Sequence, residues 1–362
     1  MYTKIEILET DFEDKYLVKH KGNLMYVGYI TKDIIELLND NKEKNEICTR
    51  LSIKYQTDIS LDTIHDVKVK VDNFLLKNEE VKSFYKIAKI FNPNRVTIPR
   101  KFYAIFNSMP FYLTLFILAI INVVFFAYSK VNTLTLNENV ILYIILFCIL
   151  IGHEIGHSIS AKKFDINVAE IGLGIYYIIP VLYVNLNEIW KLDRKKRIII
   201  NFSGIYFQFF IGLFIIIFSF IINDFKNVLI NLFNFNLMII ILNFNPFFKF
   251  DGYWIVSDLL NEKNLEKTSN QVIKNLLKFR KADCNYNIII YSILRFLFLI
   301  WILINLFKYF LNSFYQLFSS KSFNWENYFS MLILFFFLYK IIKPFFKTKT
   351  IKHELKSTKR DL

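Results

Sequence analysis

Two histidines and a glutamate lie together near the end of a long apolar run. The segment 149–164 reads ILIGHEIGHSISAKKF and contains His153, Glu154 and His157. On a helix, the four-residue spacing places both imidazoles on one face, where they can share one Zn²⁺ ion. Glu154 can then act as general base toward a metal-bound water, whose pKa the zinc lowers to about 7. Because ionisable groups at membrane depth are costly, this cluster indicates a functional site.

The elements that must position these residues are membrane helices. Of 362 residues, 54% are hydrophobic, Phe occurs 40 times, and the mean hydropathy is +0.34. A bilayer-spanning helix needs about 20 mostly apolar residues. Six runs approach this length, at 110–128, 139–157, 201–222, 228–246, 287–307 and 327–342. We therefore predict a polytopic α-helical membrane protein of about six transmembrane helices, with the shorter apolar stretch 168–190 forming strands or a re-entrant segment.

The basic residues that produce the net charge of +14 alternate with the spans. Loops 129–138 and 223–227 hold one Lys or Arg each and 308–326 holds two, whereas 158–200 holds seven and 253–286 holds six. Positive residues mark the cytoplasmic side, so both termini and the His153 end of the second span are predicted to be cytoplasmic. This pattern indicates a multi-pass protein of the cytoplasmic (inner) cell membrane in contact with the lipid bilayer, and it argues against nucleic acid as a partner.

The same orientation supplies a candidate for a third metal ligand, for which an Asp, Glu, His or Cys at the same membrane depth could serve. In LNFNPFFKFDGYW, residues 242–254, Pro246 interrupts the fourth span and Asp251 follows beside Gly252. This is again a cytoplasmic end, so Asp251 is expected at about the depth of the two histidines. A catalytic zinc usually takes three protein ligands and keeps one position open.

The remaining chain divides by composition. Residues 1–80 are polar, with two strand-like halves around KGN and three amphipathic helical patterns, which predicts a small winged-helix-like α+β domain. Residues 81–108 mix Lys and Arg with aromatics and are interpreted as a basic amphipathic linker on the membrane surface, or else an exposed linker. We assign 109–255 to the catalytic membrane core, 256–345 to a region with two further transmembrane helices, and 346–362 to a basic cytoplasmic tail.

The two motifs together resemble a known signature. HEIGH at 153–157 with NFNPFFKFDG at 243–252 is similar to the paired motifs of site-2-type intramembrane zinc proteases, with Phe250 where that family usually has Leu. The third span has Ile205 after Gly204, where the family often has proline. The resemblance covers roughly 110–255. It implies a site-2 protease-like core in which His153, His157 and Asp251 bind Zn²⁺, Glu154 is the base, and Asn243 positions or polarises the substrate carbonyl.

The resemblance also implies how substrate is held. In the family, the region before the third span supplies a strand that keeps the substrate extended, and residues 168–185 with Gly172, Gly174 and Pro180 are the candidates here. The form NPFFKFDGYW more closely resembles the subgroup found beside peptide-maturation and bacteriocin systems. Residues 1–80 are similar, more weakly, to PqqD-like peptide-recognition domains, which hold a leader peptide against an edge strand.

The favoured function is therefore a membrane-embedded zinc endopeptidase that cleaves a hydrophobic or membrane-anchored peptide precursor, in maturation of a ribosomally made peptide. Regulated intramembrane proteolysis of a membrane-bound regulator is an alternative. A second alternative is a non-proteolytic membrane protein of peptide export or immunity; export or modification proteins would be partners. Since the metal-binding residue types gather at one depth, a metal transporter is disfavoured.

Overall fold

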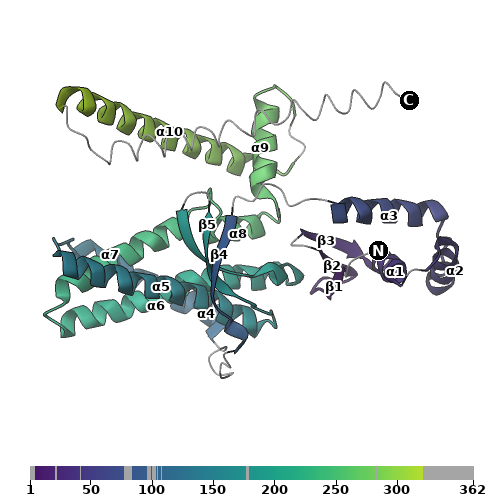
Figure 1. Ribbon diagram of the computed structural model, residues 1–362, viewed down its shortest axis with the longest axis horizontal. Helices are drawn as coiled ribbons and strands as arrows, with labels where there is room; N and C mark the ends of the chain where they lie inside the picture. Colours follow the sequence, from purple (N-terminus) through teal and green to yellow (C-terminus); the bar gives the residue numbers. More distant parts are fainter. Residues whose placement is uncertain are drawn as a thin grey trace. The chain divides into compact units, whose positions relative to one another are not determined.

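The computed structural model describes residues 5–20, 23–40, 42–76, 84–95, 99, 103, 105–106, 108–176, 179–281 and 284–320 (Figure 1). The predicted sixth span at 327–342 and the basic tail at 346–362 lie outside these residues. The described chain is mostly helical. It divides into two compact units, Met1–Asn261 and Glu262–Leu362.

The chain begins with three strands followed by three helices. Strands β1 (Glu6–Glu9), β2 (Lys15–His20) and β3 (Asn23–Gly28) form an antiparallel sheet in the order β1-β2-β3. Helices α1 (Tyr29–Asn39), α2 (Lys44–Tyr55) and α3 (Leu61–Leu76) follow. The predicted hairpin around KGN and the three helices are confirmed, whereas strand β1 was not predicted from the sequence.

The strands and helices of this N-terminal region, residues 5–76, bury apolar side chains in two clusters. One joins the sheet to α1 and α3 through residues such as Val18, Ile35 and Val71. The other packs the three helices together through Ile34, Ile47 and further residues. The periodic apolar positions seen in the sequence thus face inward, which is the usual basis of helix stability in a soluble domain.

Five described helices are long and apolar enough to cross a membrane. They occupy Met109–Tyr128 in α4 (Ser108–Tyr128), α5 (Leu136–Lys163), α6 (Arg194–Ile221), α7 (Lys226–Asn243), and Tyr286–Asn312 in α10 (Tyr286–Ser320). Each coincides with one of the first five predicted spans. Helices α5 and α6 extend beyond the predicted limits because their basic ends continue the helix. These helices indicate a membrane protein.

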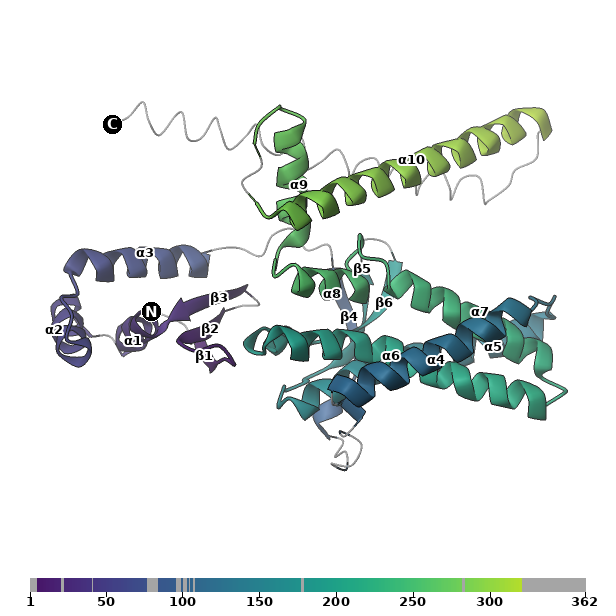
Figure 2. The same cartoon turned by 180° about the vertical axis from the view of Figure 1, so that it is seen from behind.

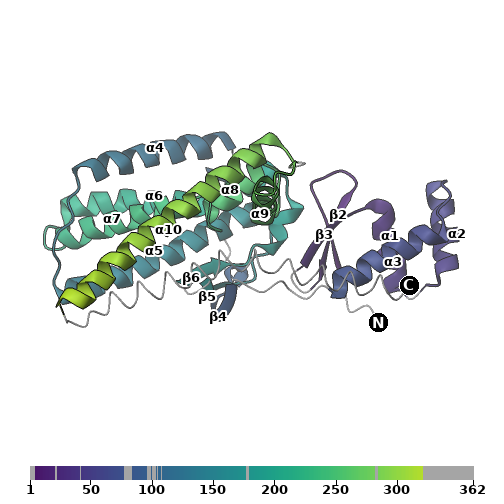
Figure 3. The same ribbon diagram turned by 90° about the horizontal axis from the view of Figure 1, so that it is seen from above.

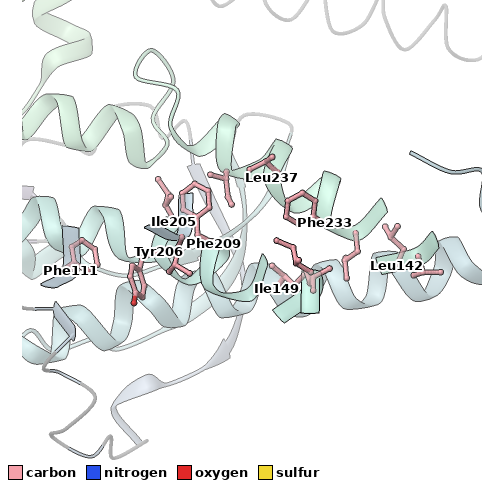
Figure 4. Packing of buried hydrophobic residues seen from close by; sticks show 14 of the residues in the cluster. Phe111, Leu142, Ile149, Ile205, Tyr206, Phe209, Phe233 and Leu237 are labelled. Carbon is pink, nitrogen blue, oxygen red and sulfur yellow. The ribbon is translucent and has the colours of Figure 1, made fainter. Parts of the chain in front are cut away.

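Helices α4, α5, α6 and α7 run alongside one another and share one apolar core (Figures 3 and 4). Phe111, Leu142, Tyr206 and Phe233 are among its buried residues. Apolar side chains also cover the outside of these helices, as at Phe116, which is 64% exposed. Helices with apolar side chains both toward the core and on their exposed faces suit a lipid environment.

A second three-stranded sheet lies beside these helices (Figure 2). Strand β5 (Ile171–Tyr176) pairs antiparallel with β4 (Phe84–Phe91) on one side and with β6 (Ile179–Val184) on the other. The strand alternative for 168–190 is therefore confirmed. Strand β4 falls within the predicted linker 81–108, where the mixture of basic and aromatic residues gave no sign of a strand partner 80 residues later in the chain.

Short helices complete the described chain. The 3₁₀ turns η1 (Pro93–Arg95) and η3 (Asn187–Lys191) flank the sheet segments, and α8 (Asp251–Leu259) follows α7. The second unit holds α9 (Leu265–Leu276) and α10. Within it Arg295 of α10 is buried and donates hydrogen bonds to Asn270 Oδ1 at 2.7 Å and Glu266 Oε1 at 3.2 Å.

Candidate metal centre

Three side chains from two helices converge on one point. His153 and His157 lie one turn apart on α5, and Asp251 is the first residue of α8. His153 Nε2 lies 3.1 Å from Asp251 Oδ2 and 3.1 Å from His157 Nε2, and His157 Nε2 lies 3.4 Å from Asp251 Oδ1. The two sequence motifs, separated by about 90 residues, thus meet in a group of three metal-ligating side chains.

Both ends of helix α5, which carries the two histidines, are well specified. Its first turn has a capping box in which Thr135 accepts from the backbone N–H of Glu138 and the Glu138 carboxylate accepts from the N–H of Thr135. Lys162 and Lys163 lie in its last turn, where positive charge is favourable. The ligands are thus displayed from a regular element rather than from a loop.

The turn between α7 and α8 brings Asp251 to the same point. Asn245 Oδ1 accepts from the backbone N–H groups of Phe247 and Phe248, which fixes a tight turn after α7. Gly252 is required there, since a Cβ atom at this position would lie 2.2 Å from the carbonyl oxygen of Phe244. The two residues of the Asp-Gly pair therefore have different roles. The aspartate faces the histidines, and the glycine allows the backbone to lie close to the Phe244 carbonyl group.

Gly204 of helix α6 lies directly against the two histidine rings. A Cβ atom at this position would lie 2.3 Å from His157 Nε2 and 2.6 Å from His153 Cε1. The helix can approach both imidazoles only because this residue has no side chain. Gly204 was noted in the sequence for its place in the third span, and its contact with the ligands became visible only when α5 and α6 were packed together.

The donor set suits a cation. His157 Nδ1 lies 2.7 Å from the carbonyl oxygen of Ile200, which can only accept a hydrogen bond, so the neutral ring carries its proton on Nδ1 and its lone pair on Nε2. That lone pair faces a carboxylate, and Asp251 Oδ2 is buried with no hydrogen-bond partner among the described residues. Acceptors that face one another without a proton are unfavourable unless a cation lies between them.

The separations also agree with a tetrahedral site. Ligand bonds of about 2.0–2.1 Å in tetrahedral geometry place the ligand atoms roughly 3.3 Å apart. The three measured separations of 3.1, 3.1 and 3.4 Å are close to that value. The fit is thus supported by the distances and by the unpartnered oxygen independently.

Glu154, the predicted base, lies next to His153 on α5 and is buried, with His153, His157 and Asp251 as its titratable neighbours. Asn243 is the last residue of α7, and its amide Nδ2 donates to Gln208 Oε1 at 3.2 Å. Since Gln208 Oε1 also lies 2.9 Å from His153 Nδ1, Asn243 is joined to the ligand group through one intervening side chain.

The predicted substrate-holding residues lie in the second sheet. Gly172 and Gly174 are in β5, where a Cβ atom would lie 2.5 Å from the Ala88 carbonyl oxygen and 2.5 Å from the Phe84 ring, respectively. Both glycines therefore permit the close approach of β4. Because both edges of β5 are already paired, this strand offers no edge for a substrate; Pro180 lies in β6, an outer strand.

The sequence reading missed a buried ion pair that supports α8. Arg197 Nε of α6 donates to Asp258 Oδ1 of α8 at 2.7 Å, and Asn201 Nδ2 donates to the other carboxylate oxygen at 3.2 Å. Burial raises the pKa of Asp258, and the guanidinium opposes that rise. No local pattern in the sequence links these two residues, which lie 61 positions apart.

Parts of the chain are similar to two proteins of named activity. A stretch of 71 residues, 19% of this chain, is 34% identical to "Putative peptide zinc metalloprotease protein YydH" of Bacillus subtilis (strain 168) and spans 27% of that protein. A stretch of 142 residues, 38% of this chain, is 30% identical to "Zinc metalloprotease MJ0392" of Methanocaldococcus jannaschii and spans 40% of it. The chain thus matches less than half the length of either relative. No family model and no solved structure matches it.

Proposed function

We propose that the protein is a membrane-embedded zinc endopeptidase of the site-2 type. The observation that carries this proposal is the convergence of His153, His157 and Asp251 beside the buried Glu154, in a chain with five helices able to span a membrane. The names of the two partial relatives point to the same metal and the same reaction class.

Each residue has a defined role in peptide hydrolysis. His153, His157 and Asp251 would hold the ion, which when bound would lower the pKa of a water to about 7. Glu154 takes the proton of the attacking water and passes it to the leaving amine. One amide hydrogen of Asn243 is engaged by Gln208, and an amide NH₂ has two, so the second is offered to the carbonyl oxygen of the scissile bond.

The substrate in this proposal is a hydrophobic or membrane-anchored peptide precursor in maturation of a ribosomally made peptide, with the site at the cytoplasmic side of the cell membrane. Strand β6 is the element we assign to hold it extended, because β6 contacts α5 and its outer edge has no strand partner among the described residues. The β1–β3 sheet with α1 to α3 is assigned to leader-peptide recognition, as a PqqD-like winged-helix module.

Zinc content of the purified protein tests the metal site. Wild-type protein is expected to hold about one zinc per chain, and the His157→Ala and Asp251→Ala variants to lose it. His65→Ala is the matched control, since His65 lies on α3 and contacts Lys44 rather than the site. Full zinc in Asp251→Ala would mean that another residue is the third ligand. A wild type that holds no zinc under conditions that do not strip metal would contradict the proposal.

Glu154→Gln separates catalysis from binding. The amide keeps the size of the side chain and removes the base, so proteolysis is expected to fall by about 10²–10⁴-fold while zinc content stays at the wild-type level. Biological activity that persists unchanged in this variant would favour the peptide export or immunity function instead.

A further inference from the structure

Gln208 of α6 lies at the centre of a buried amide network that reaches the metal centre. Gln208 and Asn236 of α7 are fully buried at 0% exposure, and His153 is nearly so. A primary amide without hydrogen bonds is costly in an apolar interior. Here the Gln208 side chain bonds to three side chains on two other helices, His153 on α5 and Asn236 and Asn243 on α7.

The direction of every bond in this network follows from one backbone group. Asn236 Nδ2 lies 3.0 Å from the carbonyl oxygen of Gln208, and a carbonyl can only accept. The amide nitrogen of Asn236 must therefore point there, which leaves Asn236 Oδ1 facing the Gln208 side chain at 3.3 Å. An oxygen at that place requires a donor, so the Gln208 nitrogen points to Asn236.

The Gln208 oxygen is then turned toward the metal centre. Oε1 has two lone pairs and two neighbours, His153 Nδ1 at 2.9 Å and Asn243 Nδ2 at 3.2 Å. Because this oxygen only accepts, His153 must carry its proton on Nδ1. Its Nε2 lone pair is thereby aimed at the point shared with His157 and Asp251.

From this network we infer that Gln208, oriented by Asn236, is a positioning residue that fixes the tautomer and ring orientation of His153 and holds the amide of Asn243. The purpose of this arrangement, which is to position a zinc ligand, rests on the proposed function. The two histidines differ in how they are held. His157 is oriented by a backbone carbonyl that no substitution removes, whereas the orientation of His153 depends on a replaceable side chain.

Gln208→Met tests the role, because methionine fills a similar volume and accepts no strong hydrogen bond. Zinc affinity, measured by competition with a chelator in detergent, is expected to fall about 10–100-fold, as is typical when an outer partner of a metal-bound histidine is lost. Asn122→Leu is the matched control. Asn122 is an equally buried amide, but it bonds to the backbone carbonyl groups of Leu118 and Phe209 and to none of the three candidate ligands. Its zinc affinity should be unchanged.

Gln208→Glu is the rescuing variant. A carboxyl group still accepts from His153 Nδ1, and in its neutral form it also donates to Asn236, so zinc affinity should return to within a few-fold of wild type. Rescue by glutamate and not by methionine would show that an accepting oxygen, rather than side-chain volume alone, is needed at this position.

Nitrogen-15 NMR of histidine-labelled, metal-free protein supplies a readout independent of zinc. The wild type should show His153 protonated on Nδ1, Gln208→Glu should retain this signature, and Gln208→Met should lose it. Unchanged affinity and an unchanged tautomer in Gln208→Met, in a wild type that binds zinc, would overturn the inference and leave the proposed function standing. If the wild type binds no zinc, the proposed function fails, while the tautomer shift would still support the role of Gln208.

Discussion

The N-terminal region and the helices α4 to α7 place polar and apolar residues in opposite ways. In residues 5–76 the apolar residues gather in two interior clusters, and Asp33 and His20 are the buried polar residues among those described. In α4 to α7 large apolar side chains cover the outside, and the interior holds two histidines, a glutamate and several amides.

The difference follows from the two environments and bears on which interior polar residues are candidates for function. In water the hydrophobic effect drives apolar residues inward, and an interior polar residue needs a structural reason. In lipid, apolar residues on the outer surface are not driven inward. Interior polar groups persist there where they bind one another or a ligand. In α4 to α8 several interior polar groups lie in or beside the candidate metal centre, and others, such as Asn122, bond to backbone carbonyl groups. In the N-terminal region the interior polar groups serve stability, so substitutions in the two regions should fail in different ways.

Gly204→Ala should have the largest effect, because it acts on the metal centre through shape alone. The added methyl group would occupy space now held by His157 Nε2 and the His153 ring, so the two imidazoles cannot keep their places. We expect loss of stoichiometric zinc with the helical circular dichroism retained. Gly152→Ala is the control on α5, since its Cβ atom would meet only the end of the Ile211 side chain at 3.1 Å. Normal zinc content in Gly204→Ala would refute the close packing of α6 against the ligands.

Arg197→Met should come next. The substitution leaves Asp258 buried without its cation, and breaking a buried pair in this way typically costs about 3–5 kcal/mol. Thermal unfolding in detergent would measure the loss, and zinc content should fall with it because Asp258 holds α8 in place behind Asp251. The double variant Arg197→Met/Asp258→Leu removes both charges, so it should recover much of the stability. A single variant as stable as wild type would mean that the pair does not support α8.

The sequence predicts the candidate ligands better than it predicts the residues that support them, and the reason is physical. The H-E-x-x-H spacing defines its own geometry on a helix, and the positive-inside pattern placed Asp251 at the same depth, so the convergence of His153, His157 and Asp251 could be predicted without a structure. Gly204, Gln208 and the Arg197–Asp258 pair act through packing between helices, which one sequence does not encode locally. Strand β4 was missed for the same reason, because its partner β5 is distant in the chain.

Asp33→Asn tests the N-terminal side of the comparison. Burial alone raises the pKa of Asp33, but hydrogen bonds from Lys54 and from Tyr55 at 2.6 Å outweigh it, so the pKa lies below its ordinary value of 3.8. A lowered pKa means that the carboxylate stabilises the fold above pH 4 and that this contribution disappears as the pH falls through the folded-state pKa. The amide should cost about 1–3 kcal/mol at neutral pH.

Hydrogen exchange of α1 and α2 would measure that cost, because it reports the local opening of the two helices that carry Asp33, Lys54 and Tyr55. Protection in the wild type should approach that of Asp33→Asn as the pH is lowered below 4. Zinc content should stay at the wild-type level, in contrast to the Gly204 variant. A stability gap that persists unchanged into strong acid would show that the charge of Asp33 is not its source.

Lys42→Gln should have the smallest effect and sets the lower end of the comparison. Lys42 pairs with Glu46 at 3.2 Å, with both side chains 37% exposed, and Glu46 keeps a second partner in Arg50. Exposed pairs of this spacing contribute about 0.3–0.5 kcal/mol, less at high salt. Exchange rates in α2 should change by less than threefold. A larger change would mean that surface charge, rather than the buried clusters, stabilises the N-terminal region, and the contrast with the membrane helices would then lose its physical basis.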